Sequence, residues 1–278
     1  MADGSDPRDT FSRSAERYLH STEHRSGPDL EVIRKAAAGS FPALVLDVAS
    51  GAGHALRAAA PYSGVCIAAD LTMEMLRVTK AHLDGLGLGP VLCVQSGAEA
   101  LPLADGRAGL VTCRIAPHHF ASVPPFLREV ARVLAPEGQF ILVDSLAPAG
   151  DTECDSFINK VERFRDPSHV RSYTSVQWEG FFRDAGLRIL LSEVFEKTHV
   201  FREWAGRVGL DEEGIRALER MFAEAPARVR RRFKVRQGSG GSVTSYTDEK
   251  GMWILKKSRQ ASSADPDPGP AAPKAGPR

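Results

Sequence analysis

The stretch of this sequence best suited to bind a ligand is a glycine-rich turn, VLDVASGAGH at residues 45–54. It follows a short apolar run and precedes a helix start. Gly51 and Gly53 allow the backbone to approach a ligand closely, with a helix N-terminus behind them. Asp47 lies inside the run before the turn, where its carboxylate could act on a cationic group. The turn alone is a weak signal, because dinucleotide-binding enzymes place G-x-G-x-x-G at the same point.

Two details disfavour a nicotinamide dinucleotide as the ligand. The third glycine of that fingerprint would fall at Leu56, whose side chain would obstruct the close helix packing that the motif requires. Asp47 does not suit a pyrophosphate. A second acid, Asp70, ends the next apolar run and could accept hydrogen bonds from two ribose hydroxyls, a role common to NAD and adenosyl cofactors.

Short apolar runs alternate with amphipathic stretches along the chain, which predicts a parallel sheet flanked by helices. The runs are continuous rather than alternating, as expected of strands covered on both faces. A Thr174/Gln177 capping box and Gly186 bracket one helix. The predicted strands are 43–48, 64–69, 91–95, 109–114, 139–144, 187–195 and 252–257, and the predicted helices are 9–20, 28–38, 72–84, 125–134, 152–164 and 174–184.

Composition narrows the functional classes further. The 278 residues are 42% hydrophobic and 26% charged, which is typical of a globular domain, and the formal charge of +1 supplies no global field toward nucleic acid or an acidic membrane. No apolar run approaches the roughly 20 residues that span a bilayer. The four cysteines form no C-x-x-C motif, so we expect free thiols and no metal site. A cytoplasmic protein without membrane association is predicted.

Several segments, in order, resemble the class I S-adenosylmethionine (SAM)-dependent methyltransferases, in their UbiE-like, type 11 branch. They are VLDVASGAGH (45–54), AADLTMEML (68–76), SGAEALPLADG (96–106), LVTCRIAPHHF (110–120), FLREVARVLAPEGQFILVD (126–144) and RDPSHVRSY (165–173). The resemblance implies an α/β fold: a Rossmann-like, doubly wound, seven-stranded, mostly parallel sheet with helices on both faces. We expect an N-terminal helical lid segment at 1–40, the methyltransferase domain at 41–258 and a disordered tail at 259–278.

The resemblance also implies which residues bind SAM. Tyr18 belongs to the lid segment over the cofactor, although simple helix packing explains it equally well. Where this chain has Gly97, the family usually has an Asp that accepts a hydrogen bond from the adenine amino group. Where this chain has Ala108-Gly109, the family usually has Phe-Asp. The implied set is Asp47, Ala49, Gly51 and Gly53 at the methionine part, Asp70 at the ribose, Leu71 and Met75 beside the adenine, Ala98 and Glu99 at its edge, and Arg114 and Ile115 below the reacting methyl.

The expected reaction is methyl transfer to a small organic acceptor, with the methylated atom left open. A general base is needed only if the acceptor must lose a proton, and His exchanges protons near neutrality. His118 and His24 are the catalytic candidates, whereas His119 and His169 are interpreted as loop-shaping residues. Two alternatives remain: an RNA methyltransferase that binds RNA through the basic run 228–236, and a non-catalytic SAM-binding protein. Oligomeric state is left open.

Overall fold

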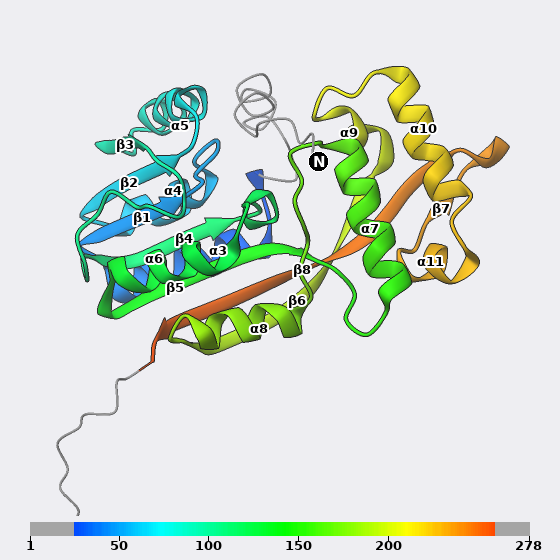
Figure 1. Cartoon of the computed structure of the whole chain (residues 1–278). Helices are drawn as coiled ribbons and strands as arrows, with labels where there is room; N and C mark the ends of the chain where they lie inside the picture. The colour runs from blue at the N-terminus through cyan, green and yellow to red at the C-terminus, as the bar shows by residue number, and fades with distance from the viewer. Residues whose placement is uncertain (1–24, 259–278) are drawn as a thin grey trace, which may run out of the picture.

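The computed structural model describes residues 25–258, which form one central sheet with helices on both faces (Figure 1). The principal strand order is β3-β2-β1-β4-β5-β8-β6. The strands are β1 (Leu44–Val48), β2 (Val65–Asp70), β3 (Val91–Gln95), β4 (Ala108–Arg114), β5 (Leu134–Leu146), β6 (Leu187–Val200), β7 (Arg236–Gln237) and β8 (Val243–Lys257).

The strand pairing confirms the predicted doubly wound, mostly parallel sheet. β1 to β5 pair in parallel, and β8 runs antiparallel between β5 and β6. The short β7 also pairs with β8, adding an eighth strand to the predicted seven. Strand order reverses between β1 and β4, which are adjacent and parallel. In open α/β sheets, ligands bind outside the carboxyl ends of the strands at such a reversal. The topology therefore predicts a ligand site at the residues after Val48 and Cys113.

Two helical layers cover the sheet, and the alternation of strand side chains divides the core between them. Leu46 and Val48 pack under α6 and α8, whereas Val45 packs under α3, α4 and α5. In α6, Phe126 and Val130 lie on one apolar face and are fully buried. These helices are α3 (Pro28–Ser40), α4 (His54–Ala59), α5 (Met73–Gly85), α6 (Val123–Val133) and α8 (Ser175–Asp184).

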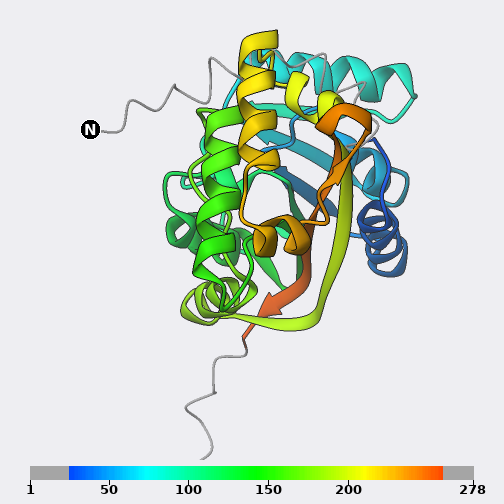
Figure 2. The ribbon, with the colours of Figure 1, turned by 90° about the vertical axis from the view of Figure 1, so that its right-hand side faces the viewer.

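A second helical cluster packs on the extended ends of β6 and β8, beyond the first core (Figure 2). Trp204, Phe222 and Tyr246 interlock there, with ring centroids 4.8 to 5.9 Å apart. The sequence predicted α7 of this cluster but not its other three helices, and it predicted only the apolar halves of β6 and β8 as strands. The helices of this cluster are α7 (Thr152–Arg165), α9 (Phe201–Gly206), α10 (Glu212–Ala223) and α11 (Ala227–Arg232).

Local signals in the sequence fix several element ends. Thr174 and Gln177 form the predicted reciprocal capping box, and Gly186 has a φ of 70° just past the end of α8. Helix α3 falls inside the expected 1–40 lid segment, yet Ile33 and Ala37 are fully buried against the domain. The rest of that segment before residue 25, and the expected tail at 259–278, lie outside the described residues. Within 25–258, no helix combines the length and apolarity needed to cross a membrane.

The basic run 228–236 is part of a folded element rather than a free patch. It forms α11 and then leads into β7, and its apolar members Val229 and Phe233 are buried in the second core. Three of its six cations pair with acids of the same chain: Arg228 lies 2.8 Å from Asp151, Arg232 2.7 Å from Glu249, and Lys234 2.6 Å from Glu196. This pairing leaves less charge for RNA than the sequence alone indicated.

Candidate active site

A cavity of about 870 Å³ opens at the carboxyl ends of β1, β2 and β4, where the strand order reverses. It is the right place and size for a nucleoside-sized ligand. Gly53 does not line it, and Tyr18 lies outside the described residues. The predicted cofactor residues that line it are Asp47, Ala49, Gly51, Asp70, Leu71, Met75, Ala98, Glu99, Arg114 and Ile115.

Asp47 ends up almost fully buried in the floor of this cavity, with 2% of its surface exposed. It lies opposite Thr112 in the β1–β4 register, and the Thr112 hydroxyl donates to its Oδ1 at 2.6 Å. Burial, followed by the nearby charge of Asp70, raises the pKa of Asp47 to about 7 despite the Thr112 hydrogen bond. A buried carboxyl of this kind is suited to a cationic ligand group, which would restore its ionised form.

The glycine turn adopts left-handed backbone at three positions: Ala49 and Gly51 with φ of 54°, and Gly53 with φ of 76°. A Cβ on Gly51 would meet nothing within 4 Å, so this residue leaves open space facing the cavity it lines. A Cβ on Gly53 would come 2.8 Å from Thr79 Cγ2 on α5. Gly53 is therefore needed for close packing of the turn on α5, not for lining the cavity.

Asp70 links the glycine turn to the end of β2. Its Oδ2 accepts from the backbone N–H of Gly51 at 2.9 Å, and its Oδ1 accepts from Thr72 N at 3.0 Å and from the Thr72 hydroxyl at 3.2 Å. Burial raises the pKa of this carboxyl, while the same hydrogen bonds oppose the rise. These hydrogen bonds hold the carboxylate in one orientation at the wall of the cavity.

Residues 96–99 form the wall beside Leu71 and Met75. Gly97 has ordinary backbone geometry, and a Cβ built on it would come 3.2 Å from Glu99 Oε2. The carboxylate of Glu99 therefore occupies the space next to position 97, where the resembling family usually carries Asp.

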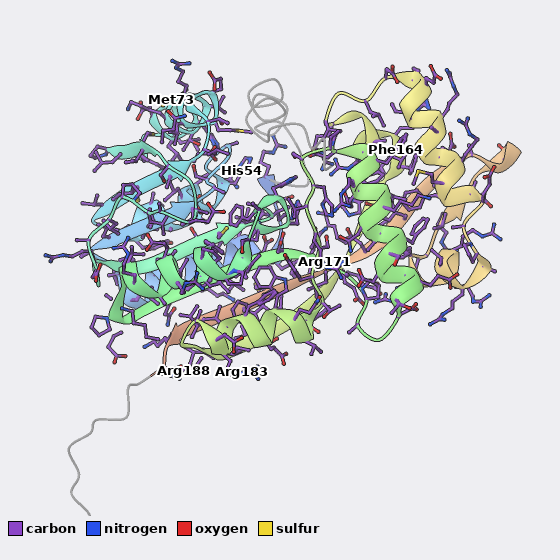
Figure 3. The ribbon with its side chains drawn as sticks, in the orientation of Figure 1. His54, Met73, Phe164, Arg171, Arg183 and Arg188 are labelled. Atoms are coloured by element: carbon purple, nitrogen blue, oxygen red, sulfur yellow. The ribbon has the colours of Figure 1, made fainter. Side chains whose placement is uncertain are left out.

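The sequence missed several lining residues, because they come from segments distant from the glycine turn. His54, the first residue of α4, lines the cavity, and Figure 3 shows it on the same side of the sheet as Met73 at the start of α5. A second group lies at the end of α7 and in the loop after it: Arg163, Pro167, Ser168, His169 and Val170. The segment RDPSHVRSY (165–173) is part of the family resemblance, but its place beside this cavity depends on the tertiary fold.

His119 and His169 contact this cavity and also shape the loop that covers it, in keeping with their predicted role. Ser168 Oγ donates its only hydrogen to Asp166 Oδ1 at 2.6 Å, so His119 Nδ1–H donates to Ser168 Oγ at 3.0 Å. Burial and the neighbouring His118 lower the pKa of His119 to about 4. His169 Nε2 lies 3.0 Å from Asn159 Oδ1, and the Asn159 amide donates to Asp155. Both rings are therefore neutral hydrogen-bonding groups near pH 7.

A second, smaller cavity of about 350 Å³ shares Arg114 and Ile115 with the first. Arg114 forms a buried ion pair with Asp29 of α3, which fixes the guanidinium between the two spaces. Ile115 has a φ of 53°, an unusual conformation for a β-branched residue. Such strain is concentrated at functional sites, and here it turns the chain at the carboxyl end of β4 between the two cavities.

His118 lines this second cavity rather than the first. Its Nδ1–H donates to Asp144 Oδ1 at 2.5 Å, and Asp144 is fully buried on β5. This bond leaves Nε2 as the ring nitrogen available to the space that the side chain lines. A carboxylate that orients an imidazole is the arrangement expected of a general base. The second catalytic candidate, His24, lies outside the described residues.

Comparison with known proteins agrees with this geometry. Residues 46–142 match the methyltransferase domain model of the type 11 family. The uncharacterized methyltransferase YcgJ of Bacillus subtilis is 34% identical over 85% of this chain and 93% of its own length. Demethylmenaquinone methyltransferase of Thermus thermophilus is 33% identical over 50% of this chain and 65% of that protein.

Two crystal structures superpose closely on the fold. BH2331 of Bacillus halodurans C-125 gives a TM-score of 0.80 at 36% identity, covering 84% of this chain and 100% of that one. The YcgJ structure gives 0.78 at 31% identity, covering 84% of this chain and 99% of that one. Both matches extend well beyond residues 46–142, so the likeness includes the sheet's distal half.

Proposed function

Because this chain belongs to the class I SAM-dependent methyltransferases, we propose that it methylates a small organic acceptor held in the second cavity, with SAM in the first. The observation that carries this proposal is that Arg114 and Ile115 line both cavities. The family resemblance places these two residues below the reacting methyl. A donor and an acceptor bound on the two sides would meet there.

The first cavity has the features that SAM requires. The open space beside Gly51 admits a ligand close to the backbone, the buried carboxyl of Asp47 matches an α-ammonium, and Asp70 suits two vicinal ribose hydroxyls. Leu71 and Met75 supply apolar contact for the adenine. In this proposal these residues bind and orient the cofactor.

When bound, SAM supplies an electrophilic methyl group whose bond to sulfur breaks, with both electrons remaining on sulfur, as the acceptor atom bonds to the carbon. Positioning and exclusion of water supply most of the catalysis in such a displacement. His118 Nε2 takes the proton that an acceptor O–H or N–H must lose and returns it to water. Asp144 keeps the His118 ring oriented and stabilises its protonated form.

The proposal predicts that purified protein binds S-adenosylhomocysteine (SAH) and transfers labelled methyl from SAM to a small molecule. Calorimetry measures the first, and radiolabel in a small-molecule product measures the second. Label found only in RNA would instead favour the RNA methyltransferase alternative. SAH binding without label in any fraction would favour the non-catalytic alternative.

The affinity for SAH is expected to fall as the pH drops below about 7. Asp47 has a pKa of about 7 in the free protein, and the ligand ammonium favours its ionised form, so binding at lower pH must expel a proton. The affinity should fall by up to about tenfold per pH unit between pH 7 and 5.5. Titration calorimetry across this range measures the slope. Asp47→Asn should bind weakly and without this slope; an equal slope in the variant would assign it to another group.

The same titration has a stability consequence that serves as an independent check. In the unfolded chain Asp47 ionises near its usual pKa of about 4, so the unfolded state binds fewer protons than the folded state between about pH 4 and 7. Stability contributed by protonated Asp47 is therefore lost as the pH rises through about 7. At pH 8, Asp47→Asn should melt several degrees higher than wild type without ligand, and lose the advantage when SAH is added.

Glu99 is expected to replace the missing Asp at position 97 as an acceptor for the adenine amino group, because its carboxylate occupies the adjacent space. Glu99→Ala should weaken SAH binding roughly fivefold, the size of a partly exposed charged hydrogen bond. Adding Gly97→Asp to Glu99→Ala should recover the affinity, since Gly97 has no left-handed φ to prevent the change. SAH calorimetry on the two variants measures this; no recovery in the double variant would contradict it.

A further inference from the structure

The second cavity is lined by charged side chains that are almost completely buried. Lys250 is 6% exposed, Arg165 is 9% and Glu162 is 8%, and all three line it. Burying ionised side chains costs free energy unless each is paired. Glu162 and Arg165 pair with each other at 2.9 Å. Apolar side chains could occupy these positions without the free-energy cost of burying charge. The buried charged groups around the cavity therefore indicate a polar ligand.

Lys250 has hydrogen-bonding capacity left over. Its Nζ donates to Ser145 Oγ and to Asp248 Oδ2, each at 2.8 Å, and these are its hydrogen bonds within residues 25–258. An ammonium has three N–H groups, so one remains. Since the side chain lines the cavity and is almost fully buried, that N–H is available to a ligand atom inside it.

The side chains that line the wall carry more positive than negative charge. Five lysine and arginine residues line the cavity against three acids; from outside the wall, Lys234 binds one of those acids, Glu196, and Asp248 binds Lys250. Burial opposes ionisation of Glu162, yet Arg165 and the further cations around it hold its pKa well below the usual range. The space therefore favours a negative charge. The basic lining residues are Arg114, Arg165, Lys197, Arg207 and Lys250.

We propose that the second cavity takes a small hydrophilic acceptor bearing a carboxylate or phosphate group, which accepts from Lys250 while the nucleophilic atom faces His118. This inference rests on the proposed function and adds the class of acceptor. A volume of about 350 Å³ is at the lower end for ligand pockets, and a long apolar chain would there contact ionised side chains.

Anion binding is tested on the SAH-loaded protein with malonate and inorganic phosphate as probes, followed by calorimetry. Wild type should bind at least one of them, and Lys250→Met should bind it at least tenfold more weakly with unchanged SAH affinity. Lys256→Met is the matched control, because Lys256 lies on the same strand but pairs with the exposed Glu137 at 2.9 Å. If Lys250→Met fails to bind SAH, the double variant Asp248→Asn/Lys250→Met, which removes both charges of the pair, is used in its place. Binding of neither probe, or equal binding by the variant, would overturn the inference.

Methyl transfer provides the second readout. The protein is incubated with labelled SAM and a bacterial extract, and the mixture is then separated into lipid, RNA and water-soluble fractions. The water-soluble product is passed over an anion-exchange resin. The inference requires label in product that the resin retains, formed at least tenfold more slowly by Lys250→Met in dilute extract. Label in lipid or in unretained product would overturn the anionic acceptor but leave methyl transfer to small molecules intact. Label in RNA alone, or in no fraction, would contradict the proposed function itself.

Discussion

Asp70→Ala is expected to weaken SAH binding by roughly 10² to 10⁴, because it removes an ionised acceptor for two ribose hydroxyls. Each hydrogen bond to a charged group contributes about 1.5–3 kcal/mol. The same carboxylate also accepts from Gly51 N and Thr72 N, so its loss releases the glycine turn from the end of β2. Calorimetry with SAH measures the loss.

Two further variants separate ribose recognition from support of the turn. Asp70→Asn keeps one oxygen acceptor of the same shape and should lose about tenfold. Asp84→Ala, which removes an exposed carboxylate paired with Lys80 on α5, should bind as wild type. Melting curves without ligand report whether the fold survives. Undiminished affinity in a folded Asp70→Ala protein would place the ribose elsewhere and contradict the cofactor assignment.

The sequence predicted the cofactor half of the molecule because its signals there are local. A buried strand, a turn with two glycines and a following helix determine one another over residues 45–59, and Asp70 ends the adjacent strand. Parallel pairing then brings Asp47 and Asp70 to one edge of the sheet without help from distant residues. Gly53 stays a predicted cofactor residue, and its further constraint, the 2.8 Å approach of a Cβ to Thr79, is a tertiary contact that spacing does not encode.

The distal half could not be predicted in the same way. The residues of the second cavity come from α3, β4, β5, α7, β6, α9 and β8. The four strands are neighbours in the sheet, but the lining residues are spread over positions 26–250 of the sequence. Lys250 and Glu162 are ordinary charged residues in sequence, and only their burial around a shared space gives them meaning. Polar residues are consecutive at 196–199 of β6 and at 247–250 of β8, so the apolar pattern does not extend over the whole length of either strand.

His118→Ala is expected to lower kcat by roughly 10² to 10⁴, the usual contribution of a positioned general base. The ring lines the second cavity and not the first, so the affinity for SAH should change little. Steady-state methyl transfer at saturating SAM, together with SAH calorimetry, measures the two effects separately. Full activity in the variant would mean that the acceptor needs no base here, as for an atom that is already deprotonated.

A structural role for His118 would also lower activity, so the decisive readout is one that packing alone does not move. Added imidazole should partly restore turnover to His118→Ala, since it can enter the space left by the ring and accept the proton. Asp144→Asn keeps the shape of the pair but removes the charge that orients the ring and stabilises its protonated form. Asp144→Asn alone should lower activity at least tenfold. Added to His118→Ala, it should lower the remaining activity only slightly, because the carboxylate acts only through the imidazole.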